Sequence, residues 1–184
     1  MSFRSLHIEN HLYFITATIA GWNKLFLDEK YILIILNSLK WLRENNRIKL
    51  FAFVIMPHHL HFICIPLNGY QIGEIIQNFG SFTAHKFLAT MRQEGEIKLL
   101  TYFKDAATKT KLKVNHHFWE KIQAKSIFSL EVLKQKLEYI HNNPIAKDWD
   151  LAANRYDYIY SSACFYDKGS KPIIEIDDVS SIMT

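Results

Sequence analysis

An α+β fold is predicted by the order of the hydrophobic patterns along this chain, by its length and by its composition. The segments follow one another as strand, helix, strand, strand, helix, and a further strand and helix come after a basic connector. The chain has 184 residues, of which 49% are hydrophobic and 22% charged, so we expect one domain and not a disordered tail or a membrane bundle. This order is typical of a split βαβ unit. It predicts a ferredoxin-like sandwich in which helices cover one face of an antiparallel sheet and leave the other face open for a ligand.

The first half of the predicted sheet comes from three segments. Residues 11–19 are rich in β-branched and aromatic side chains, which favour a strand. Apolar residues at helical spacing then predict a helix over residues 28–45. The near-continuous apolar run at residues 49–56 is typical of a central strand that is covered on both faces. Residues 59–65 follow so closely that the two strands are expected to form a hairpin.

The second half is less regular. A helix is predicted over residues 70–91, although Gly80 weakens the pattern at its middle. Residues 92–114 show no clear period and are expected to be irregular. Residues 118–127 are expected to form a short strand. A last helix is predicted from a Ser N-cap to an Asn-Pro stop, over residues 129–142.

Positive charge is concentrated in the middle of the chain. The whole sequence has 22 basic and 18 acidic residues, a net charge of +4 with His neutral. Residues 85–125 contain nine basic and four acidic residues, whereas residues 150–184 contain three basic and six acidic ones. A phosphate backbone is one partner for the basic segment, and a solvated loop is the alternative. The lysines proposed to contact DNA are Lys109, Lys111, Lys113, Lys121 and Lys125.

Composition also bears on the cellular compartment. Cys64 and Cys164 lie far apart in the sequence, and we expect two free thiols in a reducing compartment, with a single bridge as the alternative. Residues 1–10 contain no apolar core of a signal peptide, and no apolar run approaches the length of a membrane span. The protein is therefore expected to be cytoplasmic and to have no membrane partner.

The first candidate site is the segment Met-Pro-His-His-Leu-His at residues 56–61. Side chains of a strand alternate between its faces, so His59 and His61 are expected to point the same way, about 7 Å apart. Two imidazoles at this spacing can share a metal ion. The alternative is a pair of exposed histidines with no ligand. We expect His58 to lie on the opposite face or in the turn, without a role.

The second candidate site is the segment Leu-Glu-Tyr-Ile-His-Asn-Asn-Pro at residues 137–144. On a helix, Tyr139 and Asn143 are one turn apart and share a face. The alternative is a half-buried tyrosine followed by an asparagine C-cap. Because Asn143 precedes Pro144, its helical geometry is not assured.

Together the two segments predict a phosphoryl-transfer site. A tyrosine hydroxyl is a weak nucleophile at neutral pH, and an anionic phosphodiester repels nucleophiles. A divalent ion held by His59, His61 and Asn143 would polarise a phosphate oxygen and neutralise charge that develops at phosphorus. Attack by Tyr139 would leave a phosphotyrosine link that a second hydroxyl can reverse. The mixed nitrogen and oxygen ligands favour Mg²⁺ or Mn²⁺ over a closed structural zinc site.

The same residues carry a resemblance to a known family. Residues 56–61 resemble the His-hydrophobic-His motif of the HUH single-tyrosine transposases, and residues 137–144 resemble the tyrosine helix of their REP-associated (RAYT) branch. The stretches Phe-Trp-Glu at residues 118–120 and Tyr-Ile-Tyr-Ser-Ser-Ala at residues 158–163 are also similar to that branch. The similarity extends over residues 11–166.

The resemblance implies a ferredoxin-like fold and a metal-dependent enzyme that cleaves and joins single-stranded DNA. It also implies a 5′-phosphotyrosine intermediate and recognition of hairpins near the cut. His59 and His61 match the metal-binding pair, Tyr139 the nucleophile, and Asn143 the polar residue one turn beyond it. The expected domain is a catalytic unit at residues 1–166, followed by a loose C-terminal extension at residues 167–184. Relatives in the wider family work as dimers, so a homodimer and a monomer both remain open.

The chain departs from the family pattern at two positions. His58 stands where such proteins commonly have Asn, and the Gly-containing turn that often follows Pro144 is absent from residues 145–149. Two other functions remain open. One is a non-catalytic module on the same fold that binds single-stranded or hairpin nucleic acid. The other is a hydrolase that uses metal-activated water, which is disfavoured because no carboxylate base lies near the His pair in the sequence.

Overall fold

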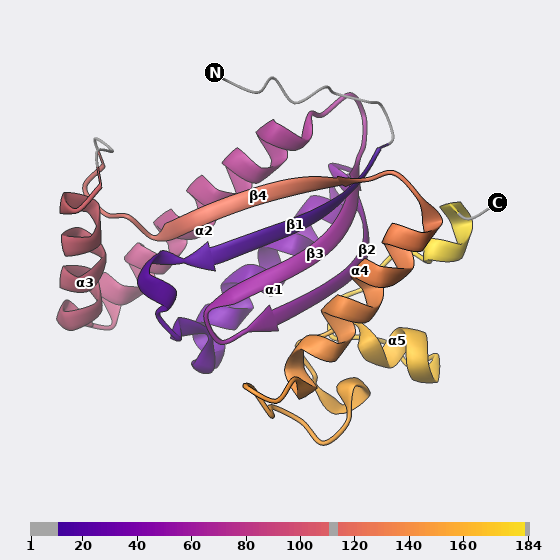
Figure 1. Ribbon diagram of the computed structural model, residues 1–184. Coiled ribbons are helices and arrows are strands. Elements are labelled where there is room, and N and C mark those ends of the chain that lie inside the picture. The colour runs from indigo at the N-terminus through magenta and orange to yellow at the C-terminus, as the bar shows by residue number, and fades with distance from the viewer. Residues whose placement is uncertain (1–10, 111–113, 183–184) are drawn as a thin grey trace.

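One antiparallel sheet organises the molecule in the computed structural model, which describes residues 11–110 and 114–182 (Figure 1). The four strands are β1 (Leu12–Ile19), β2 (Ile48–Met56), β3 (His59–Pro66) and β4 (Trp119–Ile127). Their order in the sheet is β2-β3-β1-β4, and every neighbouring pair is antiparallel. The order and the connections through two helices are those of a split βαβ unit, so the predicted α+β sandwich is confirmed.

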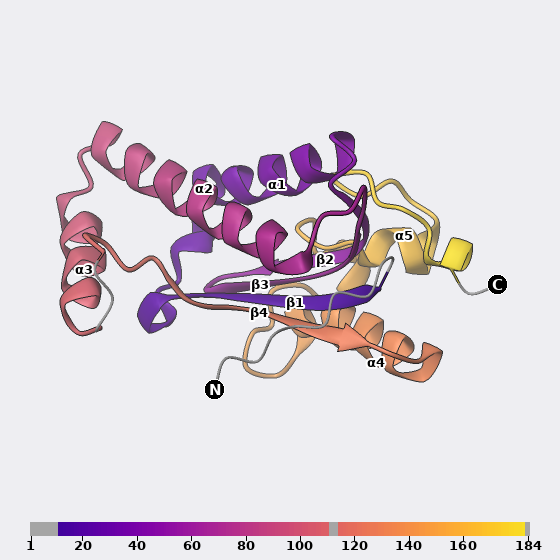
Figure 2. The ribbon, with the colours of Figure 1, turned by 90° about the horizontal axis from the view of Figure 1, so that it is seen from above.

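Helices lie on both faces of the sheet. Figure 2 shows α1 (Glu29–Glu44) and α2 (Ile72–Gln93) side by side on one face and α4 (Leu130–Asn142) on the other. The larger hydrophobic core lies under α1 and α2, and a smaller one lies between α4 and the sheet. The face that was expected to be open is therefore partly covered, because the apolar stripe of α4 is buried against it. The three residues of that stripe are Leu133, Leu137 and Ile140.

Side chains at the helix starts account for two of the element boundaries. The Asp28 carboxylate accepts a hydrogen bond from the backbone N–H of Lys30 at the start of α1. The Ser129 hydroxyl accepts one from the backbone N–H of Val132 at the start of α4, as the sequence predicts. Such caps satisfy donors that have no partner within the helix.

Gly80 lies where α2 packs against β4. A Cβ at this position would be 2.6 Å from Cδ1 of Ile122. The indole N–H of Trp119 donates to the carbonyl oxygen of Gly80, at 3.2 Å, and lies 3.1 Å from the Thr83 hydroxyl. The glycine that weakens the helical pattern is thus explained by helix–strand packing.

The expectation of an irregular segment at residues 92–114 is wrong. It contains α3 (Ile97–Thr108), which packs against α2 and buries Phe103 and Ala107. Phe103 stacks on Phe118, with ring centroids 4.7 Å apart. The two buried residues are four apart, and the charged residues around them obscure this helical spacing in the sequence.

The expectation of a loose C-terminal extension is also wrong. The short helix α5 (Ala163–Lys168) packs beside α4, and the chain that follows buries Ile174 and Val179. Arg43 of α1 donates to Asp177, with Nε and Oδ2 3.0 Å apart. The acidic tail is held by apolar contacts and by this ion pair.

Short 3₁₀ turns complete the described chain. They are η1 (Ala20–Trp22), η2 (Leu25–Leu27), η3 (Asn143–Ile145), η4 (Arg155–Asp157) and η5 (Val179–Ile182). Cys64 and Cys164 are both free, as expected. In residues 11–110 and 114–182, no helix combines the length and the apolar character that crossing a membrane requires.

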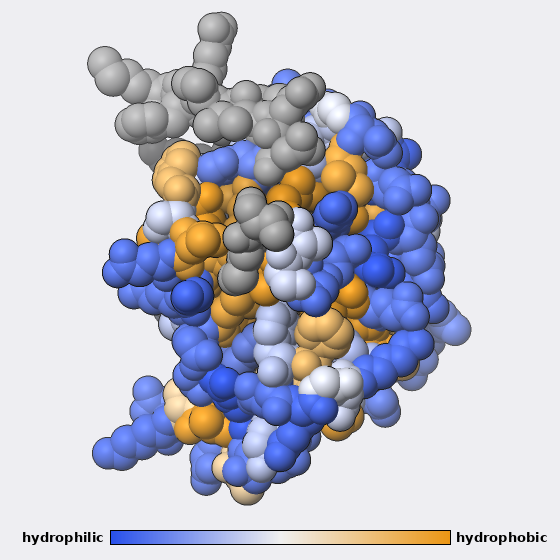
Figure 3. All heavy atoms as spheres, turned by 90° about the vertical axis from the view of Figure 1, so that its right-hand side faces the viewer, coloured by the Kyte–Doolittle hydropathy of each residue, from blue (hydrophilic) through white to orange (hydrophobic). Residues whose placement is uncertain are grey.

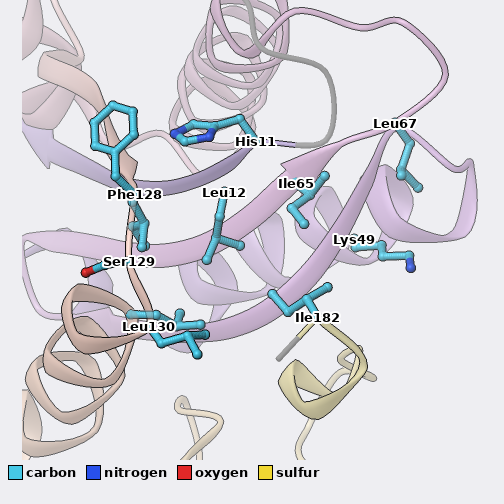
Figure 4. Close-up of a pocket in the computed structure, with 11 residues that line it drawn as sticks. His11, Leu12, Lys49, Ile65, Leu67, Phe128, Ser129, Leu130 and Ile182 are labelled. Atoms are coloured by element: carbon cyan, nitrogen blue, oxygen red, sulfur yellow. The ribbon is translucent and has the colours of Figure 1, made fainter. Parts of the chain in front are cut away.

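A pocket of about 590 Å³ opens at the end of the sheet where β1 starts and β4 ends. Figure 3 shows apolar side chains gathered in the hollow of this end of the molecule. In Figure 4, His11 and Phe128 lie together at one side of the pocket, with ring centroids 4.8 Å apart. The pocket lies at the N-terminal end of α4, so Tyr139 and the His pair belong to the opposite end of the same sheet face.

Candidate active site

The register of the sheet builds the floor of the candidate site. His61 lies opposite Thr16 on β1, and His59 lies opposite Thr18. Residues opposite one another across a sheet share a face, so both histidines point to the same side, as predicted. This is the face on which α4 packs, and α4 brings Tyr139 to the His pair.

His61 is the most enclosed member of the site. The residue is 4% exposed, and its ring stacks on that of Phe14, with centroids 5.0 Å apart. Its Nδ1 lies 2.9 Å from the Thr16 hydroxyl oxygen, and its Nε2 is buried without a hydrogen-bond partner among the described residues. When Nδ1 carries the proton, His61 donates to Thr16 and the Nε2 lone pair is available to a ligand.

Burial keeps both histidines of the pair neutral at pH 7. It lowers the pKa of His59 to about 4, assisted by the neighbouring His58, and the pKa of His61 to about 3, assisted by His59. The two rings are 4.8 Å apart between centroids. Neutral imidazole is the form that binds metal ions. The alternative of an exposed histidine pair is therefore wrong.

His58 is not incidental, contrary to the expectation from the sequence. Its Nδ1 lies 3.0 Å from Nδ1 of His59, and its ring lies 4.9 Å from that of Trp149. These contacts orient the His59 ring. In the described parts of the chain, no group of three or more His, Cys, Asp or Glu side chains is arranged to hold a metal ion.

Tyr139 lies against the His pair and faces outward. Its ring centroid is 5.2 Å from that of His61, at an interplanar angle of 67°, and 6.0 Å from that of Phe14. The residue is 50% exposed. A substrate that approaches this face can therefore reach the phenol, which lies beside the more enclosed histidines.

Lys136 is a site residue that the sequence analysis missed. Its ammonium lies 5.0 Å from the ring centroid of Phe14 and 5.7 Å from that of Tyr139. Its charge also contributes to lowering the pKa of His61, after burial and His59. No carboxylate of a described residue pairs with it. The available signal was its position one helical turn before Tyr139.

Asn143 retains helical geometry although it precedes Pro144. It is the C-cap of α4, with φ −55° and ψ −45°, and is 9% exposed. Its side-chain amide makes no hydrogen bond to a described residue. It lies in the chain between Tyr139 and Trp149, which both contact histidines of the site. The structure therefore bears out the C-cap.

The five lysines proposed to bind DNA fall into three groups. Lys121 and Lys125 are exposed on β4, where they lie opposite Thr18 and Phe14 and share the face of the site. Lys109 is the exposed C-cap of α3, which packs against α2 and the η1 turn. Lys111 and Lys113 lie outside the described residues.

Comparison with solved structures gives a match that extends over nearly the whole chain. The REP-associated tyrosine transposase bound to a REP hairpin matches with a TM-score of 0.63 and 16% identity, over 97% of this chain and 93% of the other. This chain has the fold of that transposase. Two further structures match at lower TM-scores: a proposed transposase from Deinococcus radiodurans (0.47, 14% identity, 77% of this chain and 97% of the other) and tRNA(His) guanylyltransferase from Saccharomyces cerevisiae (0.49, 12% identity, 98% and 96%). No family model and no curated protein matches the sequence.

Proposed function

We propose that this chain is a metal-dependent transposase or endonuclease that cleaves and rejoins single-stranded DNA through Tyr139 and recognises hairpin-containing DNA. One observation carries the proposal: the exposed Tyr139 lies against His61, whose Nε2 is buried without a partner among the described residues. The fold shared with a transposase that binds a REP hairpin supports the choice of DNA as the substrate. The strand and helix segments also resemble those of the single-tyrosine family.

The residues present fit a divalent metal ion. His59 and His61 are neutral, and the Nε2 of His61 lacks any other partner among the described residues. These two imidazoles and the Asn143 amide oxygen would hold Mg²⁺ or Mn²⁺ and leave positions for substrate oxygens. When bound, the ion would polarise the phosphodiester and neutralise charge that develops at phosphorus.

The chain's own residues perform the strand transfer. The Tyr139 hydroxyl oxygen attacks phosphorus, so that a bond from oxygen to phosphorus forms and the bond from phosphorus to the 3′ oxygen breaks. The phenol loses its proton to solvent water, and the departing 3′ oxygen gains one. The product is a 5′-phosphotyrosine link and a free 3′ hydroxyl, and a second 3′ hydroxyl reverses the step. The ammonium of Lys136 lies where it can stabilise the negative charge on the phosphate.

The edge strand β4 is proposed to guide the DNA. Lys121 and Lys125 are exposed on the site face and can bind successive phosphates of a strand that passes Tyr139. Lys109 lies at the C-cap of α3, where a longer segment of DNA would be needed to reach it.

The test is covalent capture of a labelled single-stranded oligonucleotide that carries a hairpin. Wild-type protein with Mg²⁺ or Mn²⁺ is expected to form an adduct that survives denaturing electrophoresis, and Tyr139→Phe is expected to form none. Tyr156→Phe is the matched control, because Tyr156 lies outside the site and its hydroxyl makes no hydrogen bond to a described residue. This control should form the adduct at the wild-type rate.

Three results would contradict the proposal. Hairpin binding without an adduct under any metal would indicate a non-catalytic binding module. A free 5′-phosphate without an adduct would indicate hydrolysis by water. An equal adduct from wild type and Tyr139→Phe would show that another residue is the nucleophile.

A further inference from the structure

An apolar groove of about 810 Å³ lies between α1 and α2, on the face of the sheet opposite to Tyr139. Its floor consists of aliphatic and aromatic side chains that continue into the larger core, among them Leu42, Ile75 and Phe79. The groove is therefore a hollow in the helical layer and shares no residue with the candidate active site.

Large aromatic side chains border this groove and remain exposed. Trp41 of α1 is 52% exposed, and Phe82 of α2 is 53% exposed. Leaving two such rings in water forgoes part of the free energy that their burial would contribute. Exposed apolar patches with polar rims mark interaction surfaces.

The rim of the groove carries positive charge that no described carboxylate neutralises. The Arg47 guanidinium lies 4.2 Å from the ring centroid of Tyr70 and 5.9 Å from that of Trp41. The Lys86 ammonium lies 5.6 Å from the ring centroid of Phe82. No acidic residue is among the described residues that line the groove. Arg47 and Lys86 contact aromatic rings and not carboxylates, so their positive charges can pair with acidic side chains of a partner.

The dimensions of the groove fit one α-helix. The lining residues of α1 run from Ile34 to Leu42, and those of α2 run from Ile75 to Lys86. At a rise of 1.5 Å per residue these spans are about 12 and about 16 Å, which correspond to about two and about three turns of a helix. Apolar anchors one turn apart are the usual way in which a helix binds such a groove.

We propose that the α1–α2 groove binds an amphipathic helix of a partner protein, with an apolar stripe for the floor and Asp or Glu beside it for Arg47 and Lys86. A second copy of this chain fits less well, because a twofold contact would bring the rim cations close to the same cations of the other copy. A nucleic acid fits less well because the floor is aliphatic and two cations bind few phosphates. The inference is independent of the proposed DNA chemistry.

The experiment measures the binding of a labelled model helix to the full chain by fluorescence anisotropy. The probe has three turns, with Leu and Phe on one stripe and Glu beside them, and a matched probe has Lys in place of Glu. We expect the Glu probe to bind about tenfold tighter than the Lys probe. Phe82→Ala and Trp41→Ala should each weaken the Glu probe about fivefold or more. Leu33→Ala is the matched control, because Leu33 is 45% exposed on α1 and does not line the groove.

Charge reversal makes the test specific. In the double variant Arg47→Glu with Lys86→Glu, the preference should invert in favour of the Lys probe. Equal binding of the two probes, no binding of the Glu probe, or equal losses in Phe82→Ala and Leu33→Ala would overturn the proposal. Concentration-dependent dimers that Trp41→Ala abolishes would assign the groove to a second copy instead. A single-stranded oligonucleotide whose binding Phe82→Ala abolishes would assign it to nucleic acid.

Discussion

The two ring nitrogens of His61 have different surroundings. Nδ1 lies beside the Thr16 hydroxyl, whereas Nε2 is buried with no hydrogen-bond partner among the described residues. A buried polar atom without a partner costs free energy, so its presence in a native structure calls for a ligand or a role. In the proposed function that ligand is the metal ion, and Thr16 fixes the tautomer that presents the lone pair.

Substitution of Thr16 by Val tests this arrangement. The side chain keeps its shape and loses the hydroxyl, so His61 loses the partner that orients it. We expect the affinity for Mn²⁺, measured by calorimetry, to fall about 10- to 100-fold. Thr18→Val, opposite His59, is the matched control, because the Thr18 hydroxyl makes no hydrogen bond to a described residue. Equal metal affinities for wild type and Thr16→Val would show that the Thr16 hydroxyl does not support a metal ligand.

Lys136 supplies a second prediction at the scale of one side chain. Its ammonium is the cation that lies over the rings of Tyr139 and Phe14. Lys136→Met should slow adduct formation about 100-fold, because a positive charge that stabilises the reacting phosphate is removed. Lys134→Met removes an exposed charge from the same helix and should leave the rate within about twofold. If both variants slow the reaction equally, the effect is general attraction of DNA and not stabilisation at the site.

The orientation of α4 depends on a group of charges around Arg155. The guanidinium donates to both carboxylate oxygens of Asp167 at 2.7 Å, to Glu138 at 2.6 Å and to Asn142 at 3.3 Å. Glu138 and Asn142 belong to α4, and Asp167 belongs to α5. Arg155 therefore connects α4 to α5. Its two partners on α4, Glu138 and Asn142, precede and follow Tyr139 in the sequence.

Asp167→Asn tests this connection through its pH dependence. The Arg155 guanidinium lowers the pKa of Asp167 below its usual value of 3.8, so the carboxylate stabilises the fold above the pKa of the unfolded chain. At pH 7 we expect the variant to lose about 1–2 kcal/mol of unfolding free energy in urea titrations. The loss should shrink as the pH falls below about 4, because the carboxyl of the unfolded wild-type chain then takes up a proton, and it should vanish once the pH has also fallen below the lowered pKa of the folded carboxyl.

An exposed acid that makes no ion pair with a described residue serves as the control. Asp148 is exposed and makes no ion pair with a described residue. Asp148→Asn should therefore change the unfolding free energy by less than about 0.5 kcal/mol at every pH. A constant difference between Asp167→Asn and wild type from pH 7 to pH 3 would contradict the assigned ion pair.

The whole molecule brings the proposed nucleophile, Tyr139, and the histidines together within one chain. Tyr139 contacts His61 of the same chain, and the site lies on one face of one sheet. In the proposed function, DNA binding and strand transfer are thus expected to use a single surface, formed by β1, β3, β4 and α4. The opposite face, with the α1–α2 groove, is left for a different partner.

This arrangement predicts that the site works in cis. A mixture of Tyr139→Phe chains and His61→Asn chains should form no covalent adduct beyond the sum of the two variants alone, at any protein concentration. The readout is the electrophoretic adduct assay after the chains have been mixed and equilibrated. Recovery of a large part of the wild-type signal would show instead that Tyr139 of one chain serves the histidines of another.

Much of the architecture could be predicted from residue patterns. The alternating strand residues around His59, the helical spacing of Leu133, Leu137 and Ile140, and the Ser129 cap specify local structure, because propensity and periodicity are local properties. The strand alternation also placed both histidines on one face. Two predictions were wrong. In α3 the helical spacing of the few apolar residues is obscured by charged neighbours, and the polar C-terminal segment packs through contacts with residues far away in the sequence.

The sequence by itself determined the four strands, the helices α1, α2 and α4 and their order, and it offered a histidine pair and a tyrosine whose chemistry would suit a strand-transfer site. Tertiary structure alone decided that the two segments meet, that His58 orients His59, and that Lys136 lies over Tyr139. It also decided that the His pair is buried and neutral, and that α1 and α2 leave a groove. The physical reason is that burial, desolvation and the meeting of distant side chains depend on how elements pack, which no local pattern encodes.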